Sequence, residues 1–419
     1  MWEKYKQKDK RIIRPLDGYE SVLISSYLNI IDVLPEFSIE DFRKNAQNNL
    51  SNIEFFNISI KIIDNHPFWI RKNFKINLKE VEWTENEEIN NILKNEHEII
   101  TPLQKEYDKE DESVIIPFLF KICKLKNNKI KLTLSVIHAM CDGRSIFYIY
   151  DLLRRVIKGE KLEKMETPLS PFNQIGNFHD LNPSIYENIP KTWNEINELS
   201  ILPKISNPIG YITVHSIYNY LPISNFCKEN KVTVQAILIA IATRAARKFN
   251  NLPKETPIWN YTPCDARPSK YSTEIFKNRK FFCNSGALFP CVIGQKNLIE
   301  DIKHCMEKLL ECKETYDNIA QILMSGKSVE PHTLKYTPPE KMPDFHKQAV
   351  VAVSNIGKIN GNNPLFFLSM DCTNEYYSFA THCYHNDEKI FMATLMPINF
   401  DKNYYKCFKE EMDLIFDIK

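Results

Sequence analysis

The sequence lacks an excess of charge of either sign. Among its 419 residues, 54 lysines and arginines face 53 aspartates and glutamates, so the formal net charge is only +1. Proteins that bind nucleic acid need a basic surface to neutralise the phosphates of the backbone. The balanced composition therefore argues against a nucleic-acid partner.

Segments that direct a protein to a membrane are also absent. The first ten residues are basic and are not followed by an apolar core, so they do not form a secretory signal. The most apolar helical stretch, residues 234–246, is interrupted by Arg244 and is too short to span a bilayer. The eleven cysteines include no Cys-x-x-Cys pair, which favours reduced thiols over a disulfide framework. We therefore expect a cytoplasmic protein without a transmembrane segment.

The composition and length predict a large folded protein. The chain is 43% hydrophobic and 12% aromatic, which suits a globular protein and not a disordered one. Its length allows two domain-sized cores. Prolines recur between residues 158 and 208 where periodicity is poor, as in a binding loop or a connection between domains. We therefore predict two subdomains, residues 1–190 and 191–419.

One stretch of the first half carries a candidate catalytic group. Apolar and polar residues alternate over residues 130–137, which predicts a half-buried strand. Apolar residues then recur at helical spacing over residues 146–157, and Asp142 and Gly143 form the turn between the two elements. The pattern places His138 at a strand end, beside a helix N-terminus and a carboxylate. Proton transfer is one role for such an imidazole, and the alternative is a core histidine next to a helix cap.

His138, Asp142 and Gly143 resemble the His-x-x-x-Asp-Gly motif of the CoA-dependent acyltransferase superfamily. This superfamily includes chloramphenicol acetyltransferase, the condensation domains of peptide synthetases and the alcohol acetyltransferases. The resemblance extends to an Arg-Pro-Leu opening at Arg14, to residues 227–238 and 258–268, and to a Ser-Asn-x-Gly sequence that begins at Ser354. Ile137 stands where condensation domains usually carry a second histidine. The sequence is therefore most similar to the alcohol acetyltransferases.

The resemblance implies an α/β (α+β) fold of two chloramphenicol acetyltransferase-like subdomains. Each would be a mostly antiparallel sheet with packed helices, and an active-site tunnel would run between them with His138 at its middle. The implied reaction moves an acyl group, expected to be acetyl, from acyl-CoA to a small alcohol. His138 would act as the general base, with no covalent acyl-enzyme. Acyl-CoA would be a co-substrate, with no permanently bound cofactor and no metal, and we expect a monomer.

The resemblance also implies roles for residues around His138. The motif aspartate of the family is structural, so Asp142 is expected to pair with Arg71. Arg267 lies at the end of a strand that ends in an arginine in the family, and we expect it to support the structure. Gly143 is expected to let substrate approach the backbone. Ser354 and Asn355 could donate to the oxyanion, with Asn284 as a further candidate, although each also fits a polar turn.

Several alternatives remain open. Cys141 lies three residues from His138 and could be a nucleophile, although buried cysteines usually act as small apolar residues. His382, Cys383 and His385 suggest a metal site, but residues three apart on a strand face opposite sides. The chain could also be an N-acyltransferase or a condensation-like, amide-forming enzyme. A catalytically silent ligand-binding member of the fold is the remaining alternative.

Overall fold

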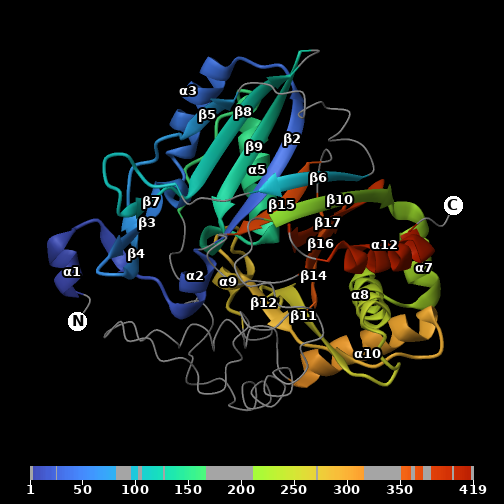
Figure 1. The fold of residues 1–419 in the computed structure, drawn as a ribbon. Coiled ribbons are helices and arrows are strands. Elements are labelled where there is room, and N and C mark those ends of the chain that lie inside the picture. The colour runs from blue at the N-terminus through green and yellow to red at the C-terminus, as the bar shows by residue number, and fades with distance from the viewer. Residues whose placement is uncertain are drawn as a thin grey trace.

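A computed structural model describes most of the chain (Figure 1). The described residues are 3–24, 26–81, 96–101, 106–125, 128–166, 211–269, 272–315, 351–359, 364–370, 379–398 and 401–416. The predicted boundary between residues 190 and 191 lies outside them. Most of the proline-bearing stretch, residues 158–208, also lies outside the described residues.

A five-stranded sheet carries the motif. Its order is β15-β2-β9-β8-β5, with only β5 and β8 running parallel. The strands are β2 (Ser26–Pro35), β5 (Leu78–Val81), β8 (Phe118–Leu125), β9 (Lys129–Ile137) and β15 (Leu365–Met370). Helix α5 (Gly143–Ile157) contacts β2, and α3 (Ile39–Leu50) contacts α5 (Figure 1). The apolar face of α5 therefore closes the core of this half.

The second sheet has eight strands and is mixed. Its strand order is β12-β11-β14-β16-β17-β10-β6, and β13 pairs with β11 beside this path. Its strands are β6 (Glu96–Thr101), β10 (Tyr211–Asn219), β11 (Ile258–Asp265), β12 (Ser285–Leu288), β13 (Cys291–Val292), β14 (Val351–Lys358), β16 (Ala380–His385) and β17 (Lys389–Pro397). Helix α8 (Val234–Asn250) packs on β14, between α10 (Leu298–Thr315) and α12 (Lys402–Phe416) (Figure 1). Because α8 is covered on several sides, it is apolar nearly all round.

A smaller sheet lies beside the first, in the order β1-β4-β3-β7. Its strands are β1 (Ile12–Pro15), β3 (Ile58–Ile63), β4 (His66–Arg71) and β7 (Val114–Ile115). The short helical segments are α1 (Glu3–Lys8), α2 (Gly18–Leu23), η1 (Glu54–Asn57), η3 (His138–Met140) and α9 (Glu274–Lys277), and α7 (Tyr220–Asn230) follows β10. Strands β7 and β8 follow one another closely but are separate, because Pro117 between them has no N–H to donate to a ladder.

The two halves of the chain exchange strands. β15, from the second half, pairs with β2 in the sheet of the first half. β6, from the first half, pairs with β10 in the sheet of the second. The aromatic core of the first half also includes Phe281 and Phe282 from the second, and Phe281 stacks on Phe55 with 4.2 Å between ring centroids. The halves therefore share their interiors as well as a surface.

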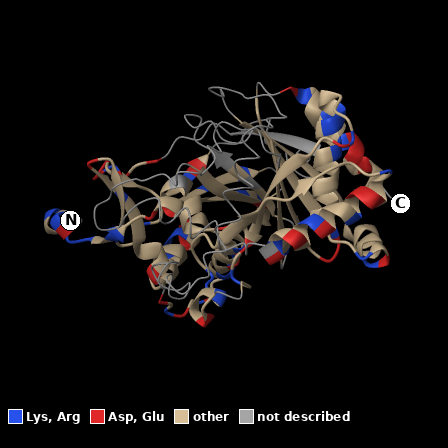
Figure 2. Ribbon diagram, turned by 90° about the horizontal axis from the view of Figure 1, so that it is seen from below, with Lys and Arg blue, Asp and Glu red and all other residues tan. Residues whose placement is uncertain are grey.

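The exterior charge is mixed. Figure 2 shows lysines and arginines interspersed with aspartates and glutamates along the outer helices. Among the described helices, none combines the length and the apolar character needed to cross a membrane. The described cysteines are all free.

Candidate active site

The structure places His138 where the sequence predicts it. Strand β9 ends at Ile137, and His138 begins the single turn η3 before α5. Asp142 is the N-cap of α5, and its Oδ1 accepts a hydrogen bond of 2.8 Å from the backbone N–H of Ser145. The cap ends the strand and fixes the loop that carries the imidazole.

A backbone carbonyl fixes the orientation of the His138 ring. Its Nδ1 lies 3.0 Å from the carbonyl oxygen of Cys141. A carbonyl can only accept, so Nδ1 carries the proton and Nε2 keeps its lone pair in the neutral ring. A neutral imidazole held in one tautomer is suited to accept a proton at Nε2.

His138 lines a cavity of about 170 Å³ between the two halves of the chain. Leu28, Gly143 and Arg144 line it from the first half. From the second half it is lined by Pro263, Cys264, Asp265, Arg267, Ser285, Ser354, Asn355, Ile356, Gly357, Phe366 and His382. A neighbouring cavity of about 490 Å³, beside α10, shares Pro263, Cys264, Asp265 and Asn355 with it. The His138 ring is thus reached by a pocket at the junction of the halves, and a tunnel through the whole protein stays a prediction.

Asp142 is held as a structural carboxylate. Its Oδ2 lies 2.9 Å from Nη2 of Arg267 and 2.9 Å from the backbone N of Asn284. Burial raises the pKa of Asp142, but the Arg267 charge and the backbone N–H groups of Ser145 and Asn284 lower it below its usual value. The carboxylate is therefore ionised, and it links the motif loop to the second half.

The predicted pair of Arg71 with Asp142 is wrong. Arg71 ends β4, its side chain is 70% exposed, and its Nη2 lies 3.3 Å from Glu54 Oε1. Arg267 takes the predicted role, with a side chain that is only 10% exposed. Its Nε also donates to the carbonyl oxygen of Arg279 at 2.6 Å. The buried arginine comes from the second half because the motif loop faces that half.

Asn284 is also misassigned as an oxyanion donor. Its side-chain Nδ2 donates to the carbonyl oxygens of Phe281, at 2.9 Å, and Phe282, at 2.8 Å, and lies 3.3 Å from Asp142 Oδ2. The residue is fully buried and does not line the cavity around His138. Because these donors are already engaged, Asn284 braces Asp142 and does not face a reacting carbonyl.

Gly143 permits a close approach of β14. A Cβ built at Gly143 would lie 2.7 Å from Cγ1 of Ile356, closer than real side chains come. The pairing of β14 with β16 is irregular between Asn355 and Gly357, and Gly357 has a φ of +86°. Asn355 Oδ1 accepts from the Gly357 N–H at 2.9 Å. This irregularity brings Ser354 and Asn355 to the cavity, and their oxyanion role stays a prediction.

The remaining candidates, Cys141, His385 and His382, lie in different surroundings. The Cys141 thiol faces the carbonyl oxygens of Val136 and Ile137, and burial raises its pKa well above the usual value. His385 stacks on Tyr220 with 4.0 Å between ring centroids, and no group of three or more possible metal ligands lies together in the described part of the chain. His382 lines the cavity with His138, and burial together with the charge of His138 lowers the pKa of His382 to about 4.

The sequence alone does not point to Cys283, which lies beside the motif loop. The residues on either side of it bond to that loop: the Phe282 N–H donates to the Met140 carbonyl oxygen at 2.7 Å, and the Asn284 N–H donates to Asp142 Oδ2 at 2.9 Å. Burial raises the pKa of Cys283, but the nearby charge of His138 and the hydrogen bond with Ser285 help to bring it below its usual value. Burial lowers the pKa of His138, but the nearby Cys283 and the backbone hydrogen bond to Cys141 help to bring it above its usual value. The one local signal is its place beside Asn284, which the resemblance gives as a candidate oxyanion donor.

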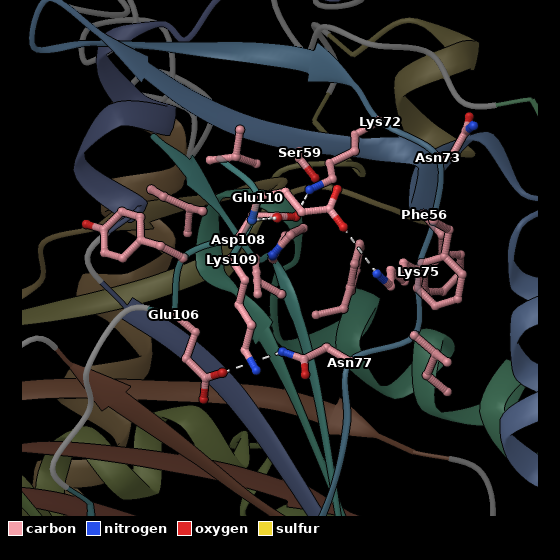
Figure 3. Close-up of a pocket in the computed structure, with 18 of the residues that line it drawn as sticks. Phe56, Ser59, Lys72, Asn73, Lys75, Asn77, Glu106, Asp108, Lys109 and Glu110 are labelled. Atoms are coloured by element: carbon pink, nitrogen blue, oxygen red, sulfur yellow. Dashed lines mark hydrogen bonds and ion pairs between the residues drawn. The ribbon is translucent and has the colours of Figure 1, made fainter. Parts of the chain in front are cut away.

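A separate cavity of about 470 Å³ lies between residues 72–79 and 106–118 (Figure 3). Its walls carry ion pairs between Lys72 and Asp108 and, at 2.6 Å, between Lys79 Nζ and Glu106 Oε2. In Figure 3 the side chains of Lys72 and Asp108 point toward one another. Three of its lining lysines, Lys72, Lys75 and Lys79, are paired with carboxylates, and no histidine is among the residues that line it, so this cavity is not the candidate active site.

Comparison with known proteins shows the fold. No protein-family profile and no curated protein sequence matches the chain. Polyketide synthase associated protein 5 from Mycobacterium tuberculosis is 12% identical, with a TM-score of 0.65 over 97% of this chain and 99% of that one. The condensation domain of the Monacolin K polyketide synthase MokA is 10% identical, with a TM-score of 0.62 over 97% of this chain and 96% of that one.

A third similar structure is the SgcC5 protein from Streptomyces globisporus, solved in complex with (R)-(-)-1-(2-naphthyl)-1,2-ethanediol and sucrose. It is 9% identical, with a TM-score of 0.63 over 96% of this chain and 98% of that one. The chain thus has the condensation-domain fold of two chloramphenicol acetyltransferase-like subdomains, as predicted. A particular closeness to the alcohol acetyltransferases stays a prediction.

Proposed function

We propose that this protein transfers an acyl group from a thioester donor, acyl-CoA, to the hydroxyl of an alcohol. The acyl group is expected to be acetyl. The observation that carries the proposal is His138, whose Nδ1 is fixed by the Cys141 carbonyl in a pocket between the two halves. The fold of acyl-transferring condensation domains supports it.

His138 is the general base in this reaction. Nε2 accepts the proton of the acceptor as its oxygen bonds to the carbonyl carbon, and the imidazolium returns the proton to the departing thiolate. General-base catalysis contributes roughly a hundred- to ten-thousandfold in rate. We expect Ser354 and Asn355 to donate to the oxyanion, and their position in the cavity lining, at the irregular part of β14, supports this role.

The proposed acyl transfer can take place in one step or in two. In the one-step form predicted from the sequence, the acceptor attacks the thioester directly and no covalent acyl-enzyme forms. That form needs a base and an oxyanion site, with no protein nucleophile. In a two-step form, a nucleophile beside the base carries the acyl group in between.

Two observations bear on the acceptor. The similar SgcC5 protein was solved with a diol, which supports a hydroxyl acceptor for this chain. The cavity around His138, of about 170 Å³, is small, which supports a short acyl group and a small alcohol. An amine acceptor, giving an amide, is the second candidate because condensation domains share the fold.

A thiol-release assay tests the proposal. The purified protein is incubated with acetyl-CoA and a panel of small alcohols and amines, and free CoA and acetylated products are measured. We expect products with alcohols, and His138→Ala should lower their rate by roughly a hundred- to ten-thousandfold. His385→Ala is the matched control, because His385 lies outside the cavity and stacks on Tyr220.

Three results would contradict the proposal in different ways. An equal rate for His138→Ala and the wild type would show that His138 is not the general base. Acetylation of amines alone would favour the second candidate. No release of thiol with any acceptor would support a catalytically silent, ligand-binding protein.

A further inference from the structure

His382 lines the same cavity as His138 but comes from the other half of the chain. It lies in β16, and its side chain is partly accessible. The next residue, Cys383, is fully buried in the core around α8. Successive side chains of a strand point to opposite faces of the sheet, so His382 faces the cavity. The acyl transfer described above gives this second imidazole no part.

Ser354 lies beside His382 on the same wall of the cavity. β14 and β16 run parallel and pair Ser354 with His382, and residues paired across neighbouring strands lie on the same face of a sheet. On the other side, β17 pairs Ala393 with His382, and the small side chain of Ala393 leaves room for the ring. Two side chains with polar hydrogens thus lie on adjacent strands of the wall that the second half supplies.

The surroundings of the His382 ring indicate which nitrogen carries the proton. Nδ1 is buried and has no hydrogen-bond partner among the residues that the structure describes. A buried N–H without an acceptor is rarer in folded proteins than a buried acceptor without a donor. The proton is therefore assigned to Nε2. Because the side chain is partly accessible and Nδ1 is not, Nε2 is also the nitrogen that can meet a ligand in the cavity.

The ring is held in place and stays neutral near pH 7. Phe366 contacts it edge-on, with 5.4 Å between the ring centroids and 67° between the ring planes. Burial and the charge of His138 lower the pKa of His382 to about 4, and the backbone of Ala393 opposes this effect only in part. His382 is therefore a neutral hydrogen-bond donor under conditions in which His138 can take up a proton.

A neutral donor across from a base is suited to stabilise an oxyanion. When the alcohol oxygen bonds to the acyl carbon beside His138, negative charge moves to the carbonyl oxygen. In a cavity of about 170 Å³, that oxygen lies near the wall from the second half, where His382 and Ser354 are placed. A cationic imidazole there would lower the pKa of His138 and weaken the base, whereas a neutral one does not.

We propose that His382 is a catalytic residue that donates its Nε2–H to the oxyanion, together with the Ser354 hydroxyl; this rests on the proposed acyl transfer. In the first step, the alcohol oxygen bonds to the acyl carbon, its proton passes to His138, and an electron pair of the carbonyl moves onto the carbonyl oxygen. That pair then re-forms the carbonyl, the bond from the acyl carbon to the CoA sulfur breaks, and His138 returns the proton to the sulfur. His382 keeps its proton throughout.

Substitutions at His382 test the position of the donor. His382→Gln keeps an N–H near the place of Nε2, His382→Asn puts one near Nδ1, and His382→Leu has none. We expect His382→Leu and His382→Asn to lower kcat roughly a hundred- to thousandfold. KM for acetyl-CoA and for the alcohol should change little, because the hydrogen bond strengthens only in the transition state. His382→Gln should restore most of kcat.

His385→Leu is the matched control, because His385 lies on the same strand but stacks on Tyr220 outside the cavity. It should keep the wild-type kcat. Circular dichroism and urea unfolding show whether each variant keeps its fold. A merely structural role for His382 would lower stability without distinguishing His382→Gln from His382→Asn in kcat.

Nitrogen-15 NMR of the histidine side chains tests the same proposal in the wild-type protein. The spectra report which ring nitrogen carries the proton and whether the ring is charged, and the His382 signals are those lost in His382→Gln. We expect a neutral ring with the proton on Nε2 from pH 5 to pH 8. His138 should carry its proton on Nδ1 when neutral, because Nδ1 donates to the Cys141 carbonyl.

The possible outcomes separate this proposal from the acyl transfer itself. Unchanged kcat in His382→Leu, with ester formation still dependent on His138, would overturn the role of His382 and leave the acyl transfer standing. A higher KM for the alcohol at unchanged kcat would make His382 an acceptor-binding residue and also overturn it. A proton on Nδ1 of His382 in the wild type would contradict it as well. If no donor and acceptor give product, the proposed acyl transfer itself fails.

Discussion

The buried pair of Asp142 and Arg267 gives the sharpest test of how the motif loop is held. In the structure Arg267 contacts Asp142, whereas Arg71 lies at the surface beside Glu54. Replacing each arginine by alanine removes one guanidinium from a charge pair in both cases. The two variants differ in burial, so they should differ in the free energy of unfolding.

The expected losses in the free energy of unfolding follow from how deeply each ion pair is buried. Arg267→Ala leaves the Asp142 carboxylate buried without its main counter-charge, which typically costs about 3–5 kcal/mol. Arg71→Ala breaks an exposed pair, and such pairs contribute about 0–1 kcal/mol. Unfolding in urea, followed by tryptophan fluorescence at pH 7, measures both variants against the wild type. We expect a large fall in the midpoint for Arg267→Ala and almost none for Arg71→Ala.

The pH dependence has a definite sign. The pKa of folded Asp142 lies below its usual value, so its contribution to stability is full above the pKa of the unfolded carboxyl, about 3.9. That contribution is lost as pH falls through the lower, folded pKa. In Arg267→Ala, burial raises the pKa of Asp142, and protonation then removes the unpaired charge. The difference in stability between this variant and the wild type should therefore shrink on acidification.

A double-mutant cycle separates the pair from the other contacts of Arg267, which also binds Asp265 at 2.9 Å. If Asp142 is the main partner, Arg267→Ala should cost less in an Asp142→Asn background than in the wild type. Equal costs in both backgrounds would refute the reasoning. So would a larger loss of stability for Arg71→Ala than for Arg267→Ala.

Three further predictions concern the cavity. Gly143→Ala should lower the free energy of unfolding, measured in urea, by about 1–3 kcal/mol, because the added Cβ meets Ile356. Adding Ile356→Ala to this variant should restore part of that loss. His382→Ala should lower kcat without moving the pH profile between pH 5 and 8, because His382, with a pKa of about 4, stays neutral there; a shifted profile would contradict this. If Asn355 donates to the oxyanion, Asn355→Ala should lower kcat roughly a hundred- to thousandfold, and Ser354→Ala measures the other candidate; unchanged kcat in both would exclude them.

What the sequence predicts well is local. The alternation before His138 and the helical spacing after it depend on neighbouring residues, and Asp142 caps α5 through a hydrogen bond only three residues away. Ser38 and Thr233 cap their helices for the same reason. Each cap is decided within one turn of helix, so a single sequence carries enough information.

What the sequence does not predict is the partner of a buried group. Arg71 and Arg267 are both plausible partners for Asp142, and only the position of Arg267, just after β11, against the motif loop decides between them. Asn284 is a similar case, since nothing near it in the sequence indicates that its backbone N–H meets Asp142. The exchange of β6 and β15 between sheets is equally non-local, because each pairs with a strand that lies more than a hundred positions away in the sequence.

That exchange also explains why the site lies where it does. β15 pairs with β2 along its length, which places Phe366 and Leu28 together in the wall of the cavity. On the other side, the irregular part of β14 contacts Gly143 through Ile356, and Arg267 and Asn284 hold Asp142. The motif loop supplies the base, but the second half supplies almost everything that faces it. The proposed role of His138 as a general base therefore depends on the two halves being locked together, and the shared strands and the buried charge pair lock them beside its ring.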